Sequence, residues 1–283
     1  MTKAKILIVG CGDLGTAIAK QLYVNHEVIG LRRSQQVLIL PISVVQADIT
    51  QPISLTPLAD LKPNIIIYCV SADAQTDESY QAQYVTGLKN IIATQLNNSN
   101  LQHVFFISST RVYGQTSDDI LDESTPAIPA DFGGKRLLEA ENVLNTLPCK
   151  STAMRLTGIY GDNRLMLVNL AKDVSRWPIT NNWSNRIHRD DAANFISFMV
   201  EKVLQKLPIK DCYIVTDDNP TLQYEVLEWL AKAQNFNLTN VHVPQNSGGK
   251  RLSNKLLRST GFALQFPNYK IGYEAVLKSQ KNA

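Results

Sequence analysis

The sequence predicts an α/β protein built on a doubly wound parallel sheet, with a second, smaller mixed domain in the C-terminal part of the chain. Two observations predict this fold class. Short apolar runs alternate with helical patterns through the first half of the chain, and most of these runs are continuous. Continuous apolar runs are typical of parallel strands covered on both faces. The 283 residues are 44% hydrophobic, which is enough for one large domain or two unequal ones.

The expected strands share a short length and a high content of β-branched and apolar residues. They are Lys5–Gly10, Glu27–Leu31, Ser43–Gln46, Asn64–Val70, His103–Ser108 and Thr152–Arg155. Between them, apolar residues recur at helical spacing, beginning near Leu14, Tyr84 and Leu137. Such alternation implies right-handed crossovers between parallel strands. The prolines between residues 52 and 63 predict a loop-rich link before the fourth strand.

After Arg155 the pattern loosens and indicates a separate lobe. The polar stretch Thr180–Arg186 predicts irregular structure, and Asp211–Val215 predicts a further strand. Helical patterns follow at Leu222–Gln234 and Arg251–Thr260.

The boundary between the two domains is soft, because the helical pattern of Asp190–Leu204 can return to the first domain. The predicted dinucleotide-binding domain comprises residues 1–157 with about 188–215, and the substrate lobe comprises 158–187 and 216–283.

Composition and charge exclude several classes of protein. The chain has 28 Lys and Arg against 25 Asp and Glu, and it has no basic run, so we expect no general nucleic-acid binding. The densest apolar run, Ile65–Val70, is far shorter than the ~18–20 residues of a membrane-spanning helix. We therefore expect no membrane segment.

The cysteines, histidines and N-terminus indicate a cytoplasmic protein without a metal site. Four cysteines lie far apart without CxxC spacing, and four histidines show no zinc-ligand spacing. The first apolar run is too short for a signal-peptide core and lacks a credible cleavage site.

The strongest motif is Gly10-Cys11-Gly12-Asp13-Leu14-Gly15, which follows the first predicted strand and opens the first predicted helix. Gly10 permits the tight turn, Gly12 lets a pyrophosphate approach the backbone, and Gly15 lets helix and strand pack closely. The helix N-terminus offers N–H groups and a positive dipole end to phosphates. The strand–turn–helix context therefore predicts dinucleotide binding.

The end of the second strand bears on which dinucleotide binds. An acidic residue there would bind the ribose 2′-hydroxyl of NAD, but the sequence has Arg32, Arg33 and Ser34 instead. Two guanidiniums suit the 2′-phosphate of NADP, so NADP is favoured. Solvated surface arginines are common enough to leave NAD open.

The chain resembles the extended short-chain dehydrogenase/reductases, also called the NAD-dependent epimerase/dehydratase family, along nearly its whole length. The family's usual glycine pattern is GxxGxxG, so GxGxxG differs slightly here. Beyond the glycine turn, the similar segments are Ala47-Asp48-Ile49, Tyr68-Cys69-Val70-Ser71-Ala72, Ile107–Gly114, Arg155–Gly161 and Arg186–Asp191. The resemblance implies a Rossmann fold with a nicotinamide cofactor and a small polar substrate.

The resemblance also implies roles for individual residues. Asp48, followed by Ile49, matches the family residue that contacts adenine, and Val70, Ser71 and Ala72 match the strand that runs under the cofactor.

Ser109 takes the family's catalytic Ser/Thr position, three residues before Val112 of the segment that resembles the S-S-x-x-V-Y-G signature. A hydroxyl at the carboxyl edge of the sheet can donate to a substrate oxygen and hold it beside the nicotinamide.

The family's Tyr-x-x-x-Lys motif lacks its tyrosine here. In the family, the lysine and the cationic nicotinamide lower the tyrosine pKa, so that its phenolate can accept a proton. If Lys135 is the family lysine, Asp131 takes the tyrosine position; if Arg136 is, Phe132 does. The C-terminal segments Lys250–Lys255 and Phe266–Tyr273 resemble one atypical branch of the family, in which this motif is often degraded.

Three interpretations of the proton transfer remain open. Asp131 acts as the base if burial raises its pKa from ~3.9. Tyr113 or Tyr160 acts instead, although either can simply pack against the sheet. Alternatively, the protein binds its cofactor and does little chemistry. Lys135 can bind ribose hydroxyls in each case.

The sequence thus predicts an NAD(P)-dependent oxidoreductase or epimerase acting on a hydroxyl or ketone of a polar metabolite, for instance a sugar nucleotide. The alternative is an NAD(P)-binding regulatory or interaction protein, which the missing tyrosine motivates. Family members often dimerise through helices flanking the sheet, so a homodimer is an expectation from the resemblance alone.

Overall fold

The chain forms two compact units, and the computed structural model describes residues 3–34, 41–116, 119–238 and 241–281. Unit 1 comprises Met1–Gly114, Ala127–Arg155 and Ala193–Tyr213, and unit 2 comprises Gln115–Pro126, Leu156–Ala192 and Ile214–Ala283.

Residues 115–126 belong to unit 2, although the chain segments on both sides of them belong to unit 1. In this segment β6 (Ile120–Leu121) pairs in parallel with β14 (Arg251–Leu252). That long-range pairing ties the segment to the C-terminal part of unit 2.

The central sheet has seven strands in the order β11-β7-β5-β4-β1-β2-β3 within the described residues. The strands are β1 (Lys5–Val9), β2 (Glu27–Arg32), β3 (Ser43–Gln46), β4 (Ile65–Tyr68), β5 (His103–Ser109), β7 (Lys150–Leu156) and β11 (Cys212–Val215). The pairings of β1 with β2 and β4, of β2 with β3, and of β4 with β5 are parallel. The predicted doubly wound sheet is confirmed.

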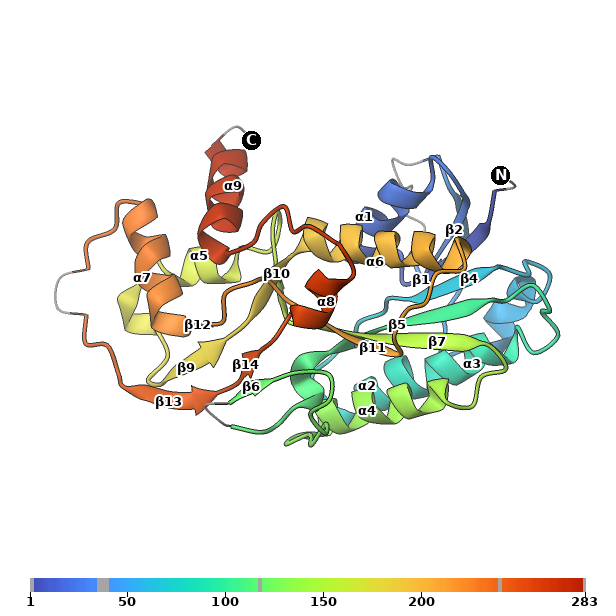
Figure 1. Ribbon diagram of the computed structural model, residues 1–283, viewed down its shortest axis with the longest axis horizontal. Coiled ribbons are helices and arrows are strands. Elements are labelled where there is room, and N and C mark those ends of the chain that lie inside the picture. Colours follow the sequence, from blue (N-terminus) through green and yellow to red (C-terminus); the bar gives the residue numbers. More distant parts are fainter. Residues whose placement is uncertain (1–2, 35–40, 117–118, 239–240, 282–283) are drawn as a thin grey trace. The chain divides into compact units, whose positions relative to one another are not determined.

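Helices cover both faces of this sheet (Figure 1). In that view α1 and α6 lie on one face, and α2, α3 and α4 lie on the other. Ile6, Leu7, Ile8 and Val9 of β1 are completely buried, which explains why the strand is apolar throughout. The helical elements are α1 (Asp13–Leu22), η1 (Pro52–Leu58), α2 (Asp77–Tyr80), η2 (Gln81–Thr86), α3 (Gly87–Ala93), η3 (Thr110–Val112), α4 (Phe132–Leu144) and α6 (Arg189–Leu204).

Unit 2 is built from short strands and helices. The strands are β6, β8 (Gly158–Tyr160), β9 (Asn181–Ser184), β10 (Arg186–His188), β12 (Thr221–Leu222), β13 (Asn246–Gly249) and β14. The helices are α5 (Met166–Leu170), η4 (Val174–Arg176), α7 (Gln223–Ala233), α8 (Lys255–Ser259) and α9 (Tyr269–Lys281). Its core gathers aromatic side chains, among them Tyr160, Trp177 and Tyr224. Among the described helices, none has the length and apolar character needed to cross a bilayer.

Two predictions for unit 2 are wrong in part. Arg251–Thr260 is not one helix, because Arg251 and Leu252 form a strand and α8 begins only at Lys255. The amide of Leu252 donates to Asn185 Oδ1 at 3.0 Å, which helps to hold this segment extended. The polar stretch at 180–186 is not irregular, because β9 pairs there with β12 and β13.

His103 predicts a specific pH dependence of stability. It is buried in β5, and its Nε2 lies 3.0 Å from Thr152 Oγ1. Burial lowers the pKa of His103 from 6.5 to about 4. The unfolded chain therefore takes up this proton first as pH falls, and the stability contributed by the neutral ring is lost between pH 6.5 and about 4.

Denaturant unfolding of the wild type and of His103→Gln at several pH values measures this effect. The wild type loses on the order of 2–3 kcal/mol more than the variant between pH 7 and pH 4. Equal slopes for the two proteins would contradict the account.

Candidate functional site

The β1–α1 turn has the backbone geometry that its glycines predict. Gly10 has a φ of +89°, and a Cβ there would collide with the carbonyl of Cys69. A Cβ on Gly15 would collide with the carbonyl of Gly10, so α1 packs directly on the turn. A Cβ on Gly12 would instead meet no atom of the described chain within 4 Å. The turn is thus closed on its sheet side and open at Gly12.

The open side of the turn is also the N-terminus of α1. Gly12 stands at the N-cap, and its carbonyl accepts the amide of Thr16 at 2.8 Å. No side chain of the described residues caps this helix end. Helix N-termini carry unsatisfied N–H groups and partial positive charge, which suit an anion. The open space and the donors therefore coincide.

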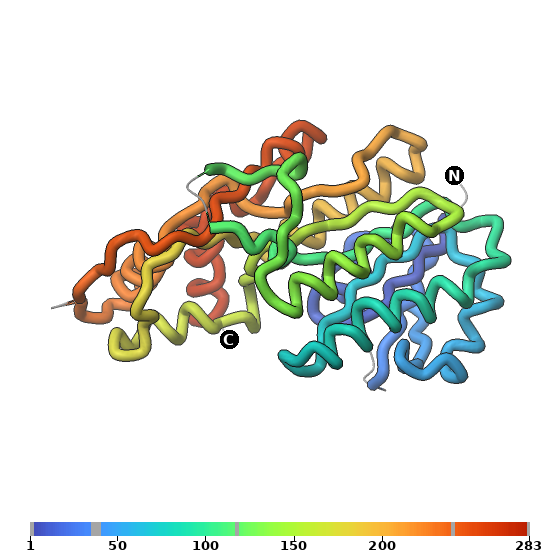
Figure 2. The backbone as a smooth tube through the Cα atoms, turned by 90° about the horizontal axis from the view of Figure 1, so that it is seen from below, coloured from blue at the N-terminus to red at the C-terminus, as the bar shows by residue number. Residues whose placement is uncertain are grey.

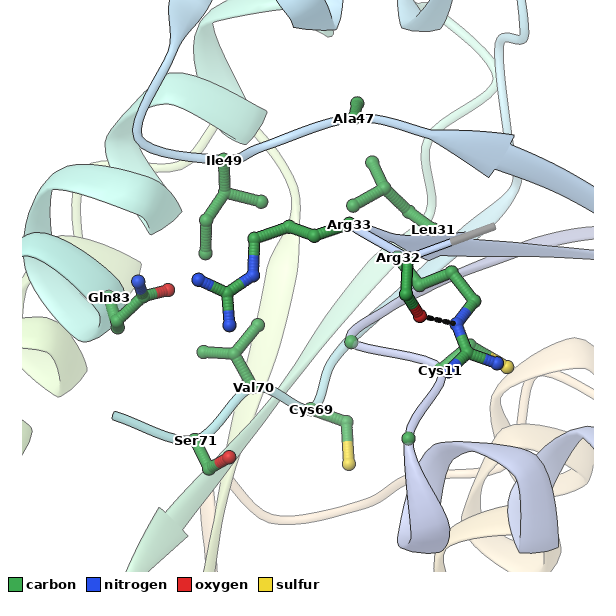
Figure 3. A pocket seen from close by; sticks show the side chains of 13 residues that line it. Cys11, Leu31, Arg32, Arg33, Ala47, Ile49, Cys69, Val70, Ser71 and Gln83 are labelled. Carbon is green, nitrogen blue, oxygen red and sulfur yellow. Dashed lines mark hydrogen bonds between the residues drawn. The ribbon is translucent and has the colours of Figure 1, made fainter. Parts of the chain in front are cut away.

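A pocket of about 250 Å³ lies beside this turn, at the carboxyl ends of β1, β2 and β4 (Figure 3). In the sheet order, β1 stands between β2 and β4, which is the point where the chain changes direction across the sheet. Ligands of open α/β sheets bind at such switch points. The pocket is therefore where a dinucleotide is expected.

The pocket is lined by many of the residues predicted to bind the cofactor. These are Gly10, Cys11, Gly12, Arg32, Arg33, Ile49, Val70 and Ser71. The other predicted cofactor residues are absent from its described lining: Asp13, Leu14, Gly15, Asp48, Ala72 and Lys135. The carboxylate of Asp48 accepts the amide and hydroxyl of Thr50 at 2.8 and 2.7 Å, so it closes the turn after β3.

Five lining residues are outside the set predicted to bind the cofactor: Leu31, Ser34, Ala47, Cys69 and Gln83. Of these, Ser34, Ala47 and Cys69 are named from the sequence only as neighbours of predicted contacts. Four of them adjoin predicted residues along the chain. Gln83 lies in η2 and is buried there, and no pattern in the sequence points to it.

The two arginines at the end of β2 both line this pocket. Arg32 Nε donates to Ser34 Oγ at 3.1 Å. The side chain of Arg33 extends across the pocket between Ile49 and Val70 (Figure 3). Its guanidinium pairs with Asp73. The cationic groups expected for a 2′-phosphate are thus present, and Arg33 already has an acidic partner.

Ser109 stands at the end of β5, where the sequence predicts it. It is the N-cap of η3, and its hydroxyl accepts the amide of Arg111 at 3.1 Å. Arg111 in turn donates through Nε to both carboxylate oxygens of Asp131 at 3.0 Å. The structure therefore brings Ser109 and Asp131 to opposite ends of one residue, Arg111.

Tyr113 is completely buried in unit 1, in a different network. Its hydroxyl accepts a hydrogen bond from Arg155 Nη1 at 2.6 Å. Arg155 is also paired with Glu141 at 2.6 Å, and Ser108 Oγ donates to the same carboxylate at 2.6 Å. Tyr113 is thus one member of a buried network that ties β5, α4 and β7 together.

Tyr160 lies in unit 2 and is 3% exposed. It packs against Tyr273 and His188. Its hydroxyl has no hydrogen-bond partner among the described residues, and burial raises its pKa far above the ordinary value. A phenol in this environment stays protonated at neutral pH.

Comparison with known proteins identifies the family. The model of the NAD dependent epimerase/dehydratase family matches residues 6–134. A provisionally assigned NAD-dependent epimerase/dehydratase of known structure from Methylobacillus flagellatus is 42% identical, with a TM-score of 0.90, and the match covers 99% of this chain and 100% of that one. The chain belongs to the NAD-dependent epimerase/dehydratase family.

Two further solved structures share the fold at low sequence identity. The Bordetella bronchiseptica enzyme WbmG in complex with NAD is 15% identical, with a TM-score of 0.79 and coverage of 99% of this chain and 95% of that one. The UDP-glucose 4-epimerase of Thermus thermophilus in complex with NAD is 15% identical, with a TM-score of 0.78 and coverage of 99% of both chains. None of the curated proteins matches the chain.

In this member of the epimerase/dehydratase family, the head of α4 holds a capping carboxylate. Asp131 is the N-cap, and its Oδ1 accepts the amide of Gly134 at 2.8 Å. Partial burial raises the pKa of Asp131, but the Gly134 amide and the Arg111 guanidinium outweigh it and lower the pKa overall. A carboxylate held in this way is a poor proton acceptor at neutral pH.

The two cations of α4 differ in their contacts. Lys135 is exposed, and its amide donates to the Asp131 carbonyl at 3.1 Å. Arg136 pairs with Asp77 at 2.8 Å and with Glu139 at 2.8 Å.

The capping role of Asp131 predicts how two substitutions differ. Asp131→Ala removes the acceptor for the Gly134 amide and lowers the free energy of unfolding by about 1 kcal/mol, whereas Asp131→Asn keeps an acceptor and costs only a few tenths of that. Denaturant unfolding of the two variants measures the difference. An equal loss in both would assign the effect to the charge pair with Arg111 instead.

Proposed function

We propose that the chain is an NAD(P)-dependent oxidoreductase or epimerase of the extended short-chain dehydrogenase type, acting on a hydroxyl or ketone of a polar metabolite. The observation that carries the proposal is the β1–α1 turn beside the pocket. The turn is open at Gly12, which is also the N-cap of α1, and no described side chain caps this helix end. Family membership, carried by the relative from Methylobacillus flagellatus, supports this class of activity. A bound nicotinamide would accept or donate hydride.

The chain's own residues would bind and orient the reactants. The glycine turn, Ile49, Val70 and Ser71 would hold the cofactor, with Asp48, Ala72 and Lys135 as further predicted contacts. Ser109 would donate a hydrogen bond to the reacting oxygen. A sugar nucleotide is the favoured substrate class, because a structural neighbour is a UDP-glucose 4-epimerase.

We propose NADP as the preferred cofactor, with NAD as the alternative. Arg32 and Arg33 both line the pocket at the end of β2, and an acidic residue is absent from that strand end. Guanidinium groups suit a 2′-phosphate. The neighbours from Bordetella bronchiseptica and Thermus thermophilus were each solved with NAD, which supports a nicotinamide cofactor in general.

Thermal unfolding with NAD(H) or NADP(H) tests cofactor binding. A ligand at a hundred times its Kd stabilises the wild type by about 2.7 kcal/mol. Gly12→Ala keeps the same melting temperature without ligand, because its Cβ has free space, but it occupies the approach of the pyrophosphate. The variant therefore loses most of the ligand-induced shift. No shift in the wild type with either cofactor would overturn the proposal.

A second candidate function is an NAD(P)-binding regulatory or interaction protein with little catalysis. The contacts of the predicted acid/base groups favour it: Asp131 caps a helix, and Tyr113 is buried against Arg155. Each of these groups already accepts hydrogen bonds from protein donors, so neither is placed as the general base that would take a proton from substrate.

Ser109→Ala separates the two candidates. For an enzyme, loss of the hydroxyl lowers kcat/KM by about 100-fold on a carbonyl and sugar-nucleotide panel, while cofactor affinity is kept. The exposed Ser99→Ala is the matched control and keeps full turnover. Abolished turnover in Ser109→Ala alone would refute the regulatory candidate, and a wild type that binds cofactor but turns over nothing would refute the enzyme.

We further propose a homodimer and a cytoplasmic location. Figure 2 shows α3 and α4 running side by side, and the groove along them is lined by the apolar Ile92, Ala93, Leu96 and Val143 together with the polar Lys89, Glu139, Asn142 and Thr146. Apolar residues that gather on one face between polar ones favour a covered surface in the assembly. All four cysteines are free, which supports a reducing compartment.

A further inference from the structure

Arg33 is held by a bidentate ion pair that joins two edges of the pocket region. Its Nη1 donates to Asp73 Oδ2 at 2.6 Å, and its Nη2 donates to Asp73 Oδ1 at 2.5 Å. Arg33 follows β2, whereas Asp73 lies in the segment between β4 and α2. Two parallel N–H···O bonds use the same donor fork that recognises a phosphate.

Asp73 is itself fixed from the neighbouring helix. Gln83 Nε2 donates to Asp73 Oδ2 at 3.0 Å, and the amide of Asp73 donates to Ser79 Oγ at 3.1 Å. Gln83 is 7% exposed, and its backbone carbonyl accepts a hydrogen bond from the hydroxyl of Tyr68. The carboxylate of Asp73 is therefore held toward Arg33 by the side chain of the buried Gln83 and by the hydrogen bond of its own backbone amide to Ser79.

The Arg33 side chain lies in the pocket that the cofactor would occupy. Figure 3 shows it crossing between Ile49 and Val70 toward Gln83. An arginine that pointed into solvent would leave this space clear.

From this geometry we infer that Asp73 is a specificity-determining residue, which lowers the affinity of the site for the 2′-phosphate of NADP by competing for the Arg33 guanidinium. The inference rests on the proposed cofactor site. A 2′-phosphate must displace or share the carboxylate on Arg33 before it can bind the guanidinium. The 2′-hydroxyl of NAD carries no charge and does not need to displace the carboxylate.

The charge of Asp73 and the exposure of the Arg33 and Asp73 side chains agree with this competition. Hydrogen bonding to Arg33 lowers the pKa of Asp73, so the carboxylate is ionised at neutral pH. The side chains of Arg33 and Asp73 are 52% and 48% exposed. Solvent therefore screens the pair, and a phosphate can open it. The expected effect is a change of selectivity rather than a block to binding.

Isothermal titration of wild type and Asp73→Asn with NAD(H) and NADP(H) tests the inference. Asn keeps the shape of the side chain but not its charge. The variant shifts the ratio of the two Kd values about tenfold toward NADP(H), which is the equivalent of about 1.4 kcal/mol. Its affinity for NAD(H) stays within about twofold. Asp73→Ala gives a shift in the same direction.

Asp77→Asn is the matched control. Asp77 lies four residues along the chain and is paired with Arg136, which is not among the described residues that line the pocket, whereas Asp73 is paired with Arg33, which is. The same charge is removed, and the ratio of Kd values stays as in the wild type. An equal shift in Asp77→Asn would reduce the effect to general electrostatics and overturn the inference.

The double variant Arg33→Ala/Asp73→Asn tests whether Asp73 acts through the guanidinium of Arg33. Against the Arg33→Ala background, Asp73→Asn leaves the Kd ratio unchanged, because the guanidinium over which they compete is gone. A persistent shift, or an unchanged ratio in Asp73→Asn alone, overturns the inference while the proposed cofactor site stands. A wild type that binds neither cofactor overturns both.

Discussion

The close packing of the β1–α1 turn against the neighbouring strand end is the constraint on which the candidate site depends. Gly10 lies so near the carbonyl of Cys69, and Gly15 so near the carbonyl of Gly10, that side chains at either position would collide with backbone. This packing fixes the start of α1 relative to β1 and β4. The helix N-terminus, the open face at Gly12 and the loop after β4 consequently border one pocket.

Charge pairing shapes the rest of the carboxyl edge of unit 1. Several arginines there are held by carboxylates that are distant in the sequence. The pairs are Arg33 with Asp73, Arg111 with Asp131, Arg136 with Asp77 and Arg155 with Glu141. Charged side chains that look available for binding or catalysis in the sequence are thus held in ion pairs in the structure. The buried pair of Arg155 and Glu141 has the strongest such role, since removing one partner would leave a charge in the core.

Much of the fold could be predicted from the sequence, because continuous apolar runs and glycine turns are local signals. The strands at Lys5, Glu27 and Ser43 begin where the apolar patterns begin. The error at Arg251–Thr260 arises from a long-range signal, since its first residues pair with β6 across more than a hundred positions. Local helical spacing carries no information about that partner.

In the candidate site too, features given by local sequence signals could be predicted, and features that depend on long-range contacts could not. The pocket-lining positions of Gly12, Arg33 and Val70 could be predicted, because they follow directly from strand ends and the glycine turn. Whether Asp131 can act as a base could not be predicted, because its pKa depends on Arg111. This residue lies twenty positions earlier and contacts Asp131 only in the folded chain. Sequence spacing predicted which residues stand at the sheet edge, and it could not predict which of them neutralise one another.

A crystal structure of the chain grown with NADP or NAD is the most direct test of the central claim. The account predicts pyrophosphate oxygens at the first turn of α1, against the open face of Gly12, with the β1–α1 turn in the backbone conformation described above. Cofactor density elsewhere on the chain, or a turn whose open face is filled by protein atoms in the presence of saturating cofactor, would contradict it.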